Sequence, residues 1–207
     1  MAPSRQARLE QLGEAVRVCT ECRLSLSRRV AVPGEGPLDA RLLLVGEAPG
    51  AEEDALGRPF VGASGRFLRR ELEAAGIPLE MAYITNVVKC RPPANRMPRA
   101  DEIAICTSLY LARQMEIVQP GAVLALGATA AQALLAGRLR LTEEHGTWRR
   151  DYELTDQALE VFVTYHPAAA LRNERWREEL RTDLRRLAAT LAEPRLAHRG
   201  ADQWGVL

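Results

Sequence analysis

The chain has 207 residues, 47% of them hydrophobic, and a net charge of +1, which together suit one globular domain and disfavour two full ones. No apolar run approaches the roughly 20 residues of a membrane-spanning helix, and the first residues form no apolar signal segment, so we expect a soluble cytoplasmic protein. Lys89 is the only lysine among 28 basic residues, and the abundant arginine suits phosphate binding without requiring it.

Helical and strand patterns alternate along the chain. Helical spacing of apolar residues predicts helices near 5–18, 64–75, 99–118, 126–135 and 175–191. Short, continuous apolar runs predict buried strands at 41–45, 82–88, 122–126 and 159–164. This alternation predicts an α/β fold in which helices cover both faces of a parallel sheet.

The chain shows no internal repeat and no low-complexity linker over residues 1–192. We therefore expect a single domain over this range. The segment 193–207 contains Pro194 and Gly200 but few periodic apolar positions, so we expect an extended C-terminal tail.

Four cysteines stand out: Cys19 and Cys22 form a C-x₂-C pair, and Cys90 and Cys106 follow far along the chain. Four thiolates can hold zinc or an iron–sulfur cluster, and the spacing leaves this choice open. The missing signal segment disfavours two disulfides, and the C-x₂-C pair disfavours four unrelated buried thiols. A metal centre is the favoured reading.

Polar residues follow three of the predicted strands. Glu47 comes directly after the strand at 41–45 and its terminal Gly46, Asn86 lies near the end of the second strand, and His166 follows the fourth. Ligands of doubly wound sheets bind at the carboxyl ends of the strands. A carboxylate, an amide and an imidazole are therefore predicted to meet in one pocket.

Together with the cysteines, four motifs make the chain resemble the family 4 uracil-DNA glycosylases over most of residues 15–192. These motifs are GEAPGAEEDALGRPFVG at 46–62, YITNVVKCRPP at 83–93, LALGATAAQ at 124–132 and YHPAAALRN at 165–173. The resemblance implies a three-layer α/β/α sandwich with a central four-stranded parallel sheet. It also implies a [4Fe–4S] cluster on the four cysteines, and release of uracil from DNA to leave an abasic site.

The resemblance also suggests roles for the pocket residues. Phe60 would stack on a flipped base, Asn86 would pair with the imide edge of uracil, and His166 would donate to a ring carbonyl as charge develops there. Taken alone, these residues could equally be a core phenylalanine, a strand-end cap and a satisfied histidine. We expect His145 and His198 to be such satisfied histidines, because neither lies in a recognisable motif.

The acidic residues are harder to assign. In family 1 glycosylases the corresponding loop carries an aspartate that orients the attacking water, and in this chain Ala48 occupies that position. We expect Gly46 and Ala48 to be among the residues that bind the substrate. Glu47 is the nearest carboxylate and is our candidate for positioning the water. Glu53 resembles a family glutamate placed beside the uracil ring.

Contacts to DNA are predicted mainly after His166. Leu171 is our candidate for an apolar wedge and Arg172 for a phosphate contact, although Leu171 could instead begin the closing helix. Further candidates for phosphate contacts, each of which could also be merely solvated, are Arg58, Lys89, Arg91 and Arg96.

The sequence is also compatible with other functions. The chain could be a relative that traps uracil-containing DNA covalently, although the histidine of that type's extra loop is missing after Asn86. It could also be a non-catalytic uracil-DNA sensor with a redox-active cluster. A small-molecule enzyme with structural zinc is a third possibility. We expect a monomer that acts on single- or double-stranded uracil-containing DNA, with a sliding clamp or another repair protein as a conceivable partner.

Overall fold

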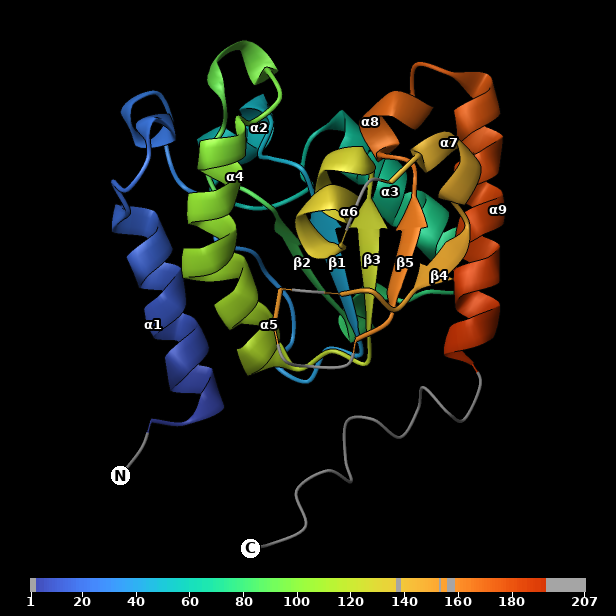
Figure 1. Ribbon diagram of the computed structural model, residues 1–207, viewed down its shortest axis with the longest axis horizontal. Helices are drawn as coiled ribbons and strands as arrows, with labels where there is room; N and C mark the ends of the chain where they lie inside the picture. Colours follow the sequence, from blue (N-terminus) through green and yellow to red (C-terminus); the bar gives the residue numbers. More distant parts are fainter. Residues whose placement is uncertain (1–2, 137–138, 153, 156–158, 193–207) are drawn as a thin grey trace, which may run out of the picture.

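The computed structural model describes residues 3–136, 139–152, 154–155 and 159–192, so the predicted tail at 193–207 lies outside the described residues. Its sheet has the strand order β2-β1-β3-β5-β4 (Figure 1). The strands are β1 Leu42–Gly46, β2 Ala82–Asn86, β3 Ala122–Leu126, β4 Thr147–Arg149 and β5 Val161–Thr164.

Four of these strands, β1, β2, β3 and β5, run parallel, as the sequence predicts. The prediction of four strands in total is wrong, because β4 pairs antiparallel with β5 at the edge of the sheet. β4 has three residues and none of them is buried, so it lacks the apolar run by which the other strands were found.

The predicted helices are present with small shifts in their ends, and several short helices that the sequence analysis missed join them. The described helices are α1 Arg5–Val18, α2 Ala51–Leu56, α3 Ala63–Ala74, α4 Ala100–Cys106, α5 Ala112–Val118, α6 Ala128–Leu134, α7 Leu141–Glu144, α8 Pro167–Ala170 and α9 Glu174–Leu191. Single 3₁₀ turns lie at Arg23–Leu26, Leu79–Met81 and Pro93–Asn95. A π-helical turn, Thr107–Leu111, joins α4 to α5, so the helix predicted at 99–118 is continuous but changes its winding after Cys106.

Helices cover both faces of the sheet and give the expected three-layer sandwich (Figure 1). Successive strand residues point to opposite faces, so Leu43 and Val45 of β1 pack with α1, α4, α5 and α6. Leu42 and Leu44 pack with α3 and α9 on the other face. All five residues of β1 are buried, as expected for a strand covered on both sides.

The carboxyl ends of the parallel strands meet at one edge, the upper one in Figure 1. The register makes Gly46, the last residue of β1, the partner of Asn86, the last residue of β2. The loops that leave β1 and β2 therefore start side by side, and the loop that leaves β5 starts at the same edge, on the other side of β3. Within the described ranges, no helix is both long and apolar enough to cross a membrane.

Candidate active site and cysteine centre

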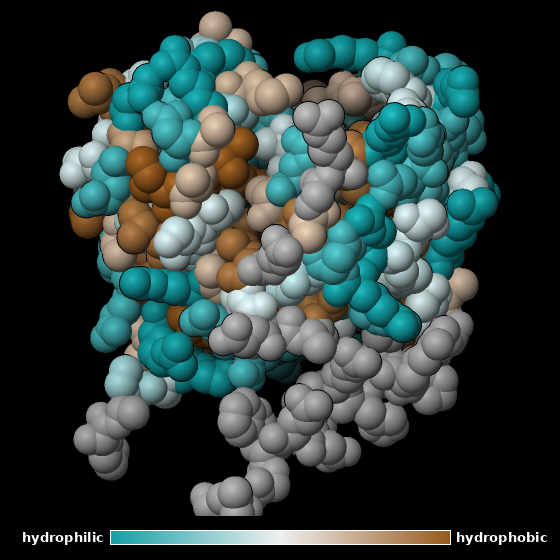
Figure 2. Space-filling view, viewed as in Figure 1, coloured by the Kyte–Doolittle hydropathy of each residue, from teal (hydrophilic) through white to brown (hydrophobic). Residues whose placement is uncertain are grey.

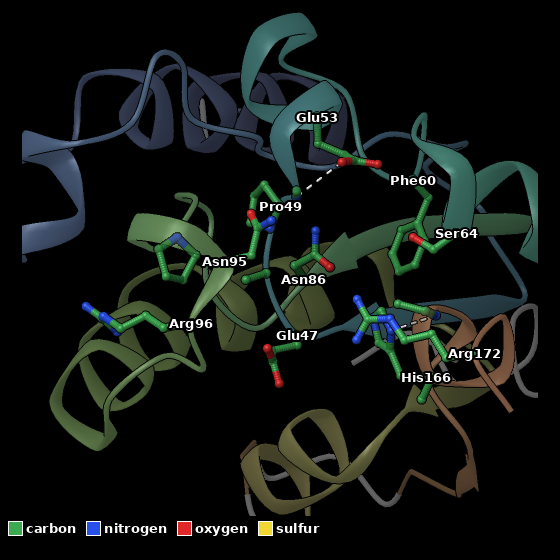
Figure 3. A pocket seen from close by; sticks show the side chains of 15 residues that line it. Glu47, Pro49, Glu53, Phe60, Ser64, Asn86, Asn95, Arg96, His166 and Arg172 are labelled. Atoms are coloured by element: carbon green, nitrogen blue, oxygen red, sulfur yellow. Dashed lines mark hydrogen bonds between the residues drawn. The ribbon is translucent and has the colours of Figure 1, made fainter. Parts of the chain in front are cut away.

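A pocket of about 420 Å³ opens at this edge of the sheet. The space-filling view has a notch at its top, between the part that holds α4 and the part that holds α8 and α9 (Figure 2). Side chains from all three strand ends line the pocket (Figure 3), namely those of Glu47, Ala48, Glu53, Phe60, Asn86, His166 and Arg172. The predicted convergence of a carboxylate, an amide and an imidazole is therefore present in the fold.

Asn86 faces this pocket from the end of β2. Its side chain is buried, and its Oδ1 atom has no hydrogen-bond partner among the described residues. A buried amide oxygen without a partner costs free energy unless a ligand pairs with it. Gly46 makes room for this arrangement, because a Cβ atom there would lie 2.4 Å from Asn86 Oδ1 and 2.5 Å from Phe60 Cζ.

The Phe60 ring forms a fixed wall of the pocket. Phe60 is 5% exposed and has a φ of 51°, a left-handed conformation that is uncommon for a bulky residue. Two neighbours hold this backbone: Gly65 leaves space against it, and Arg69 Nε donates to the Phe60 carbonyl at 3.2 Å. The ring centroid lies 6.2 Å from that of His166, so both rings border the same space.

His166 is held in one tautomer. The Ala168 N–H donates to Nδ1 at 3.1 Å, so in the neutral ring the proton is on Nε2. Burial lowers the pKa of His166 to about 4, with a smaller contribution from Arg172. Gly127 allows the close approach of α6, because its φ is 89° and a Cβ there would lie 2.9 Å from His166 Cβ. The imidazole is thus a neutral hydrogen-bond donor at neutral pH.

Glu47 is oriented by a residue that the sequence analysis did not single out. Thr129 of α6 donates from Oγ1 to Glu47 Oε2 at 2.5 Å. Thr129 lies three residues after the end of β3, inside the LGATAAQ motif, so its place at a strand end was the available signal. Ala48, half-buried in the pocket wall, has no polar side chain that could orient a water.

Both carboxylate oxygens of Glu53 are bound by main-chain groups. The Gly50 N–H donates to Oε2 at 3.1 Å, and the Gly62 N–H donates to Oε1 at 2.8 Å. Glu53 therefore joins the loop before α2 to the loop before α3 while it also lines the pocket. This bracing contact was not predicted.

The predicted DNA-contacting residues separate into two groups. Arg172 and Arg96 line the pocket, although Arg96 also pairs with Glu102 at 2.7 Å. Leu171 is not part of the pocket lining and is partly buried against the core. It lies between α8 and α9, so it does not begin the closing helix α9.

The other three basic candidates lie elsewhere. Arg58 borders a separate groove and pairs with Glu35 at 2.8 Å, and Arg91 donates to the Asn95 side chain at 2.8 Å. The prediction that Lys89 contacts a phosphate is wrong, because its side chain is 1% exposed. Burial also lowers the pKa of Lys89 to about 8.

Of the two histidines expected to be satisfied, His198 lies outside the described residues, and His145 is confirmed as one. Its Nδ1 lies 2.9 Å from Asp183 Oδ2, and its ring centroid lies 4.7 Å from that of Tyr165. This contact lies between α7, β5 and α9 and is separate from the pocket lining.

The four cysteines line one small cavity between α1, the loop after β2 and α4. Two basic residues contact them: Arg28 Nη1 donates to Cys90 Sγ at 3.0 Å, and the Lys89 N–H donates to Cys106 Sγ at 3.3 Å. Burial raises the pKa of both Cys90 and Cys106, whereas Arg28 and Lys89 oppose that rise.

These contacts suit a group that binds thiolates. Hydrogen bonds and positive charge directed at sulfur stabilise the anionic form that a metal or a cluster requires. Within the described ranges, no three His, Cys, Asp or Glu side chains form a group that could hold a single metal ion. The four cysteines share one cavity, and thiolates are ligands of both zinc and iron–sulfur clusters.

Comparisons with known proteins agree with this geometry. The family model of the uracil DNA glycosylase superfamily matches residues 33–188. A type-4 uracil-DNA glycosylase of Thermotoga maritima is 44% identical over 174 residues, which cover 82% of this chain and 86% of that protein. One from Pyrobaculum aerophilum is 42% identical over 179 residues, or 85% and 91% of the two chains.

A type-5 uracil-DNA glycosylase of Pyrobaculum aerophilum is less similar, with 36% identity over 155 residues. That match covers 66% of this chain and 65% of that protein. The higher identities and longer coverage are on the type-4 side. The chain therefore belongs to the uracil DNA glycosylase superfamily and, within it, to the type-4 family.

Proposed function

We propose that this protein is a DNA repair enzyme that takes uracil out of the DNA stack, hydrolyses its N-glycosidic bond and leaves an abasic site. The curated relatives named type-4 uracil-DNA glycosylases support this function. The single observation that carries it is the unpaired Oδ1 atom of Asn86, buried in a pocket bordered by Phe60 and His166.

Asn86 suits the imide edge of uracil. Its Oδ1 would accept from the ring N3–H and its Nδ2 would donate to the neighbouring carbonyl. Cytosine presents an unprotonated N3 and an amino group at these positions, so both contacts would be mismatched. A site whose buried polar atoms stay unpaired with the wrong base rejects that base strongly. The Phe60 ring would stack on the flipped uracil.

The reaction separates charge. When the bond between N1 of uracil and C1′ of the sugar breaks, the electron pair stays on uracil and positive charge forms on the sugar. His166 would donate from Nε2 to the ring carbonyl next to N1, and a preoriented donor that meets charge as it develops lowers the barrier. The neutral form is the one that the Ala168 contact favours.

Glu47 would act on the opposite charge. Because Thr129 binds one of its oxygens, the other is left for the attacking water or for the cationic sugar. Water adds its hydroxyl group to C1′, and the released proton passes to the Glu47 carboxylate or to solvent. Glu47 would therefore position the attacking water, which the side chain of Ala48 cannot do.

A [4Fe–4S] cluster on Cys19, Cys22, Cys90 and Cys106 is part of the proposal. Its four thiolate ligands would join α1, the loop after β2 and α4 in one rigid unit, and the cluster would hold these segments without cleaving the bond. Arg28 and the Lys89 main chain would donate to the sulfurs of Cys90 and Cys106 that hold the cluster. The supporting observation is the shared cavity of the four side chains.

The test is incubation of the purified protein with single- and double-stranded oligonucleotides that contain one uracil. We expect free uracil and alkali-labile abasic sites, with His166→Ala and Glu47→Ala each slower by about 100-fold or more. No release from either substrate would refute the proposal. A protein–DNA adduct that survives denaturation would instead indicate the covalently trapping type.

A further inference from the structure

The only lysine of the chain, Lys89, is buried against the main chain of Asn86 and lines the cysteine cavity. The other 27 basic residues are arginines, so the sequence is strongly biased toward Arg wherever a positive charge suffices. Lys89 is 1% exposed and is among the largest fully buried side chains of the residues that the structure describes. An ammonium group in the interior is costly unless each of its N–H groups is paired. We therefore expect the site of Lys89 to have a requirement that arginine does not meet.

The contacts of the ammonium group explain this requirement. Nζ donates to Thr85 Oγ1 at 2.7 Å, to the Asn86 carbonyl at 2.6 Å and to Gln114 Oε1 at 2.7 Å. Three acceptors match the three N–H donors of an ammonium group, whereas arginine presents a wider planar fork with five donors. In the described part of the chain, no carboxylate forms a salt bridge with Lys89.

This contact fixes the end of β2. Because Lys89 holds the carbonyl of Asn86 and the hydroxyl of the residue before it, the backbone that carries the Asn86 side chain has little freedom. The network continues outward, since Thr85 Oγ1 and Gln114 Nε2 both donate to the Pro33 carbonyl, at 3.0 and 2.6 Å. It joins β2, α5 and the loop before β1.

The side-chain oxygen of Asn86 has no such support of its own. No described residue donates to Oδ1, so its direction depends on the backbone behind it and on the packing of Gly46 and Phe60 in front. Lys89 is also next to Cys90, and its main-chain N–H donates to Cys106 Sγ. One residue therefore contacts both the cysteine centre and the backbone of the predicted base reader.

We propose that Lys89 is a positioning residue for base recognition, whose ammonium group fixes Asn86 so that its unpaired amide oxygen faces the flipped base. The proposal rests on the proposed function, because it assumes that Asn86 reads uracil. It predicts that losing the ammonium weakens contacts to the base and leaves contacts to the DNA backbone intact.

Two DNA ligands separate these effects. One carries a 2′-fluorinated deoxyuridine that resists hydrolysis, and the other carries a tetrahydrofuran abasic analogue with no base. For Lys89→Met, we expect affinity for the uracil ligand to fall by at least about tenfold, because the group that recognises the base is displaced. Affinity for the abasic analogue should change by less than about twofold, because that ligand has no base to recognise. Lys89→Arg should behave like Lys89→Met, because charge alone does not supply three convergent donors.

A milder variant covers the case in which the lysine variants fail to fold. Thr85→Val keeps the side-chain shape but removes one acceptor, and should lower affinity for the uracil ligand alone, by less than Lys89→Met does. Arg113→Lys, an exposed change next to Gln114, is the matched control and should alter neither affinity. Visible absorption of the cluster shows whether each variant keeps its cysteine centre.

Equal losses for both ligands, or no loss in Thr85→Val and the lysine variants, would overturn the positioning role. Failure of the proposed function looks different, because the unaltered protein itself would then bind the uracil ligand no more tightly than the abasic analogue.

Discussion

At the scale of single residues, His166 shows how burial sets the protonation state of the proposed donor. Removing an imidazolium from water is costly, so the pKa of His166 falls to about 4, and the Ala168 N–H further favours the ring with an unprotonated Nδ1. A neutral imidazole suits this role, because it can donate a hydrogen bond to the uracil anion without transferring its proton. The same shift has a consequence for stability.

We expect the free energy of unfolding to decrease as the pH falls from about 6.5 to about 4. In this window the unfolded chain binds a proton at His166 that the folded chain does not, so stability is lost toward acid, by at most about 1.4 kcal/mol per pH unit. Urea unfolding of the parent protein and of His166→Asn across this range measures the effect. The same pH dependence in both proteins would show that His166 does not cause it.

Gly46 is the second residue at which the pocket geometry makes a sharp prediction. In Gly46→Ala the new methyl group would lie 2.4 Å from Asn86 Oδ1 and 2.5 Å from the Phe60 ring, so one of them must move. We expect a stability loss of about 1–3 kcal/mol and a rate of uracil release lower by about 100-fold. Single-turnover kinetics and denaturant unfolding measure the two effects.

Gly13→Ala is the control for that substitution. Gly13 lies inside α1, and a Cβ there would come no closer than 3.6 Å to a neighbouring atom. Since alanine favours helix over glycine by about 1 kcal/mol, this variant should be as stable as the parent or more so, with unchanged activity. A similar rate loss in both variants would mean that the crowding at Gly46 is unimportant.

At the scale of elements, the cysteine centre joins segments that are far apart in the sequence. Cys19 and Cys22 follow α1, Cys90 follows β2, and Cys106 ends α4 just before the π-helical turn. The helix α9 packs on the opposite face of the sheet, with no residue in the cysteine cavity. Removing the proposed cluster should therefore loosen one side of the molecule.

We expect Cys22→Ser to lose iron and to show faster amide hydrogen exchange over 17–30 and 88–106, because the crosslink between these segments is gone. Exchange in α9 should stay close to that of the parent protein. Iron analysis and hydrogen exchange followed by mass spectrometry test this. A uniform increase that includes α9 would show that the centre supports the whole fold instead of one side.

At the scale of the whole molecule, the net charge is only +1, so attraction to DNA would depend on individual arginines and not on the total charge. Arg96 and Arg172 both line the pocket, where a DNA backbone would pass. Neutralised phosphates release counterions, so affinity should fall with salt in proportion to the number of such contacts. Many other arginines are paired within the protein, for example Arg181 with Glu71 at 2.9 Å.

We expect Arg172→Gln to reduce the slope of log affinity against log salt concentration by about 1, because one phosphate contact is lost. Arg8→Gln, an exposed change on α1 away from the pocket, should leave the slope unchanged. Fluorescence anisotropy with labelled uracil-containing DNA between low and moderate salt provides the measurement. An unchanged slope for Arg172→Gln would remove Arg172 from the DNA-contacting surface.

The sequence by itself determined the order of the four parallel strands and of the longer helices, and it placed Glu47, Asn86 and His166 at or just after strand ends. Continuous apolar runs such as Leu42 to Val45 can only be buried between two layers, and parallel strands bring their carboxyl ends together, so Glu47, Asn86 and His166 were predictable as neighbours. The four cysteines were likewise predictable as one centre, since the C-x₂-C pair carries the signal locally.

Only the tertiary structure decided how the polar side chains are paired, because those contacts join segments far apart in the chain. Nothing in the local sequence of Lys89 shows that its ammonium group is buried on the Asn86 carbonyl, or that Thr129 holds Glu47. The edge strand β4 was missed because its three residues owe their conformation to pairing with β5 and have no apolar run of their own. These features depend on packing between elements, so the periodicity of apolar residues within each element could not predict them.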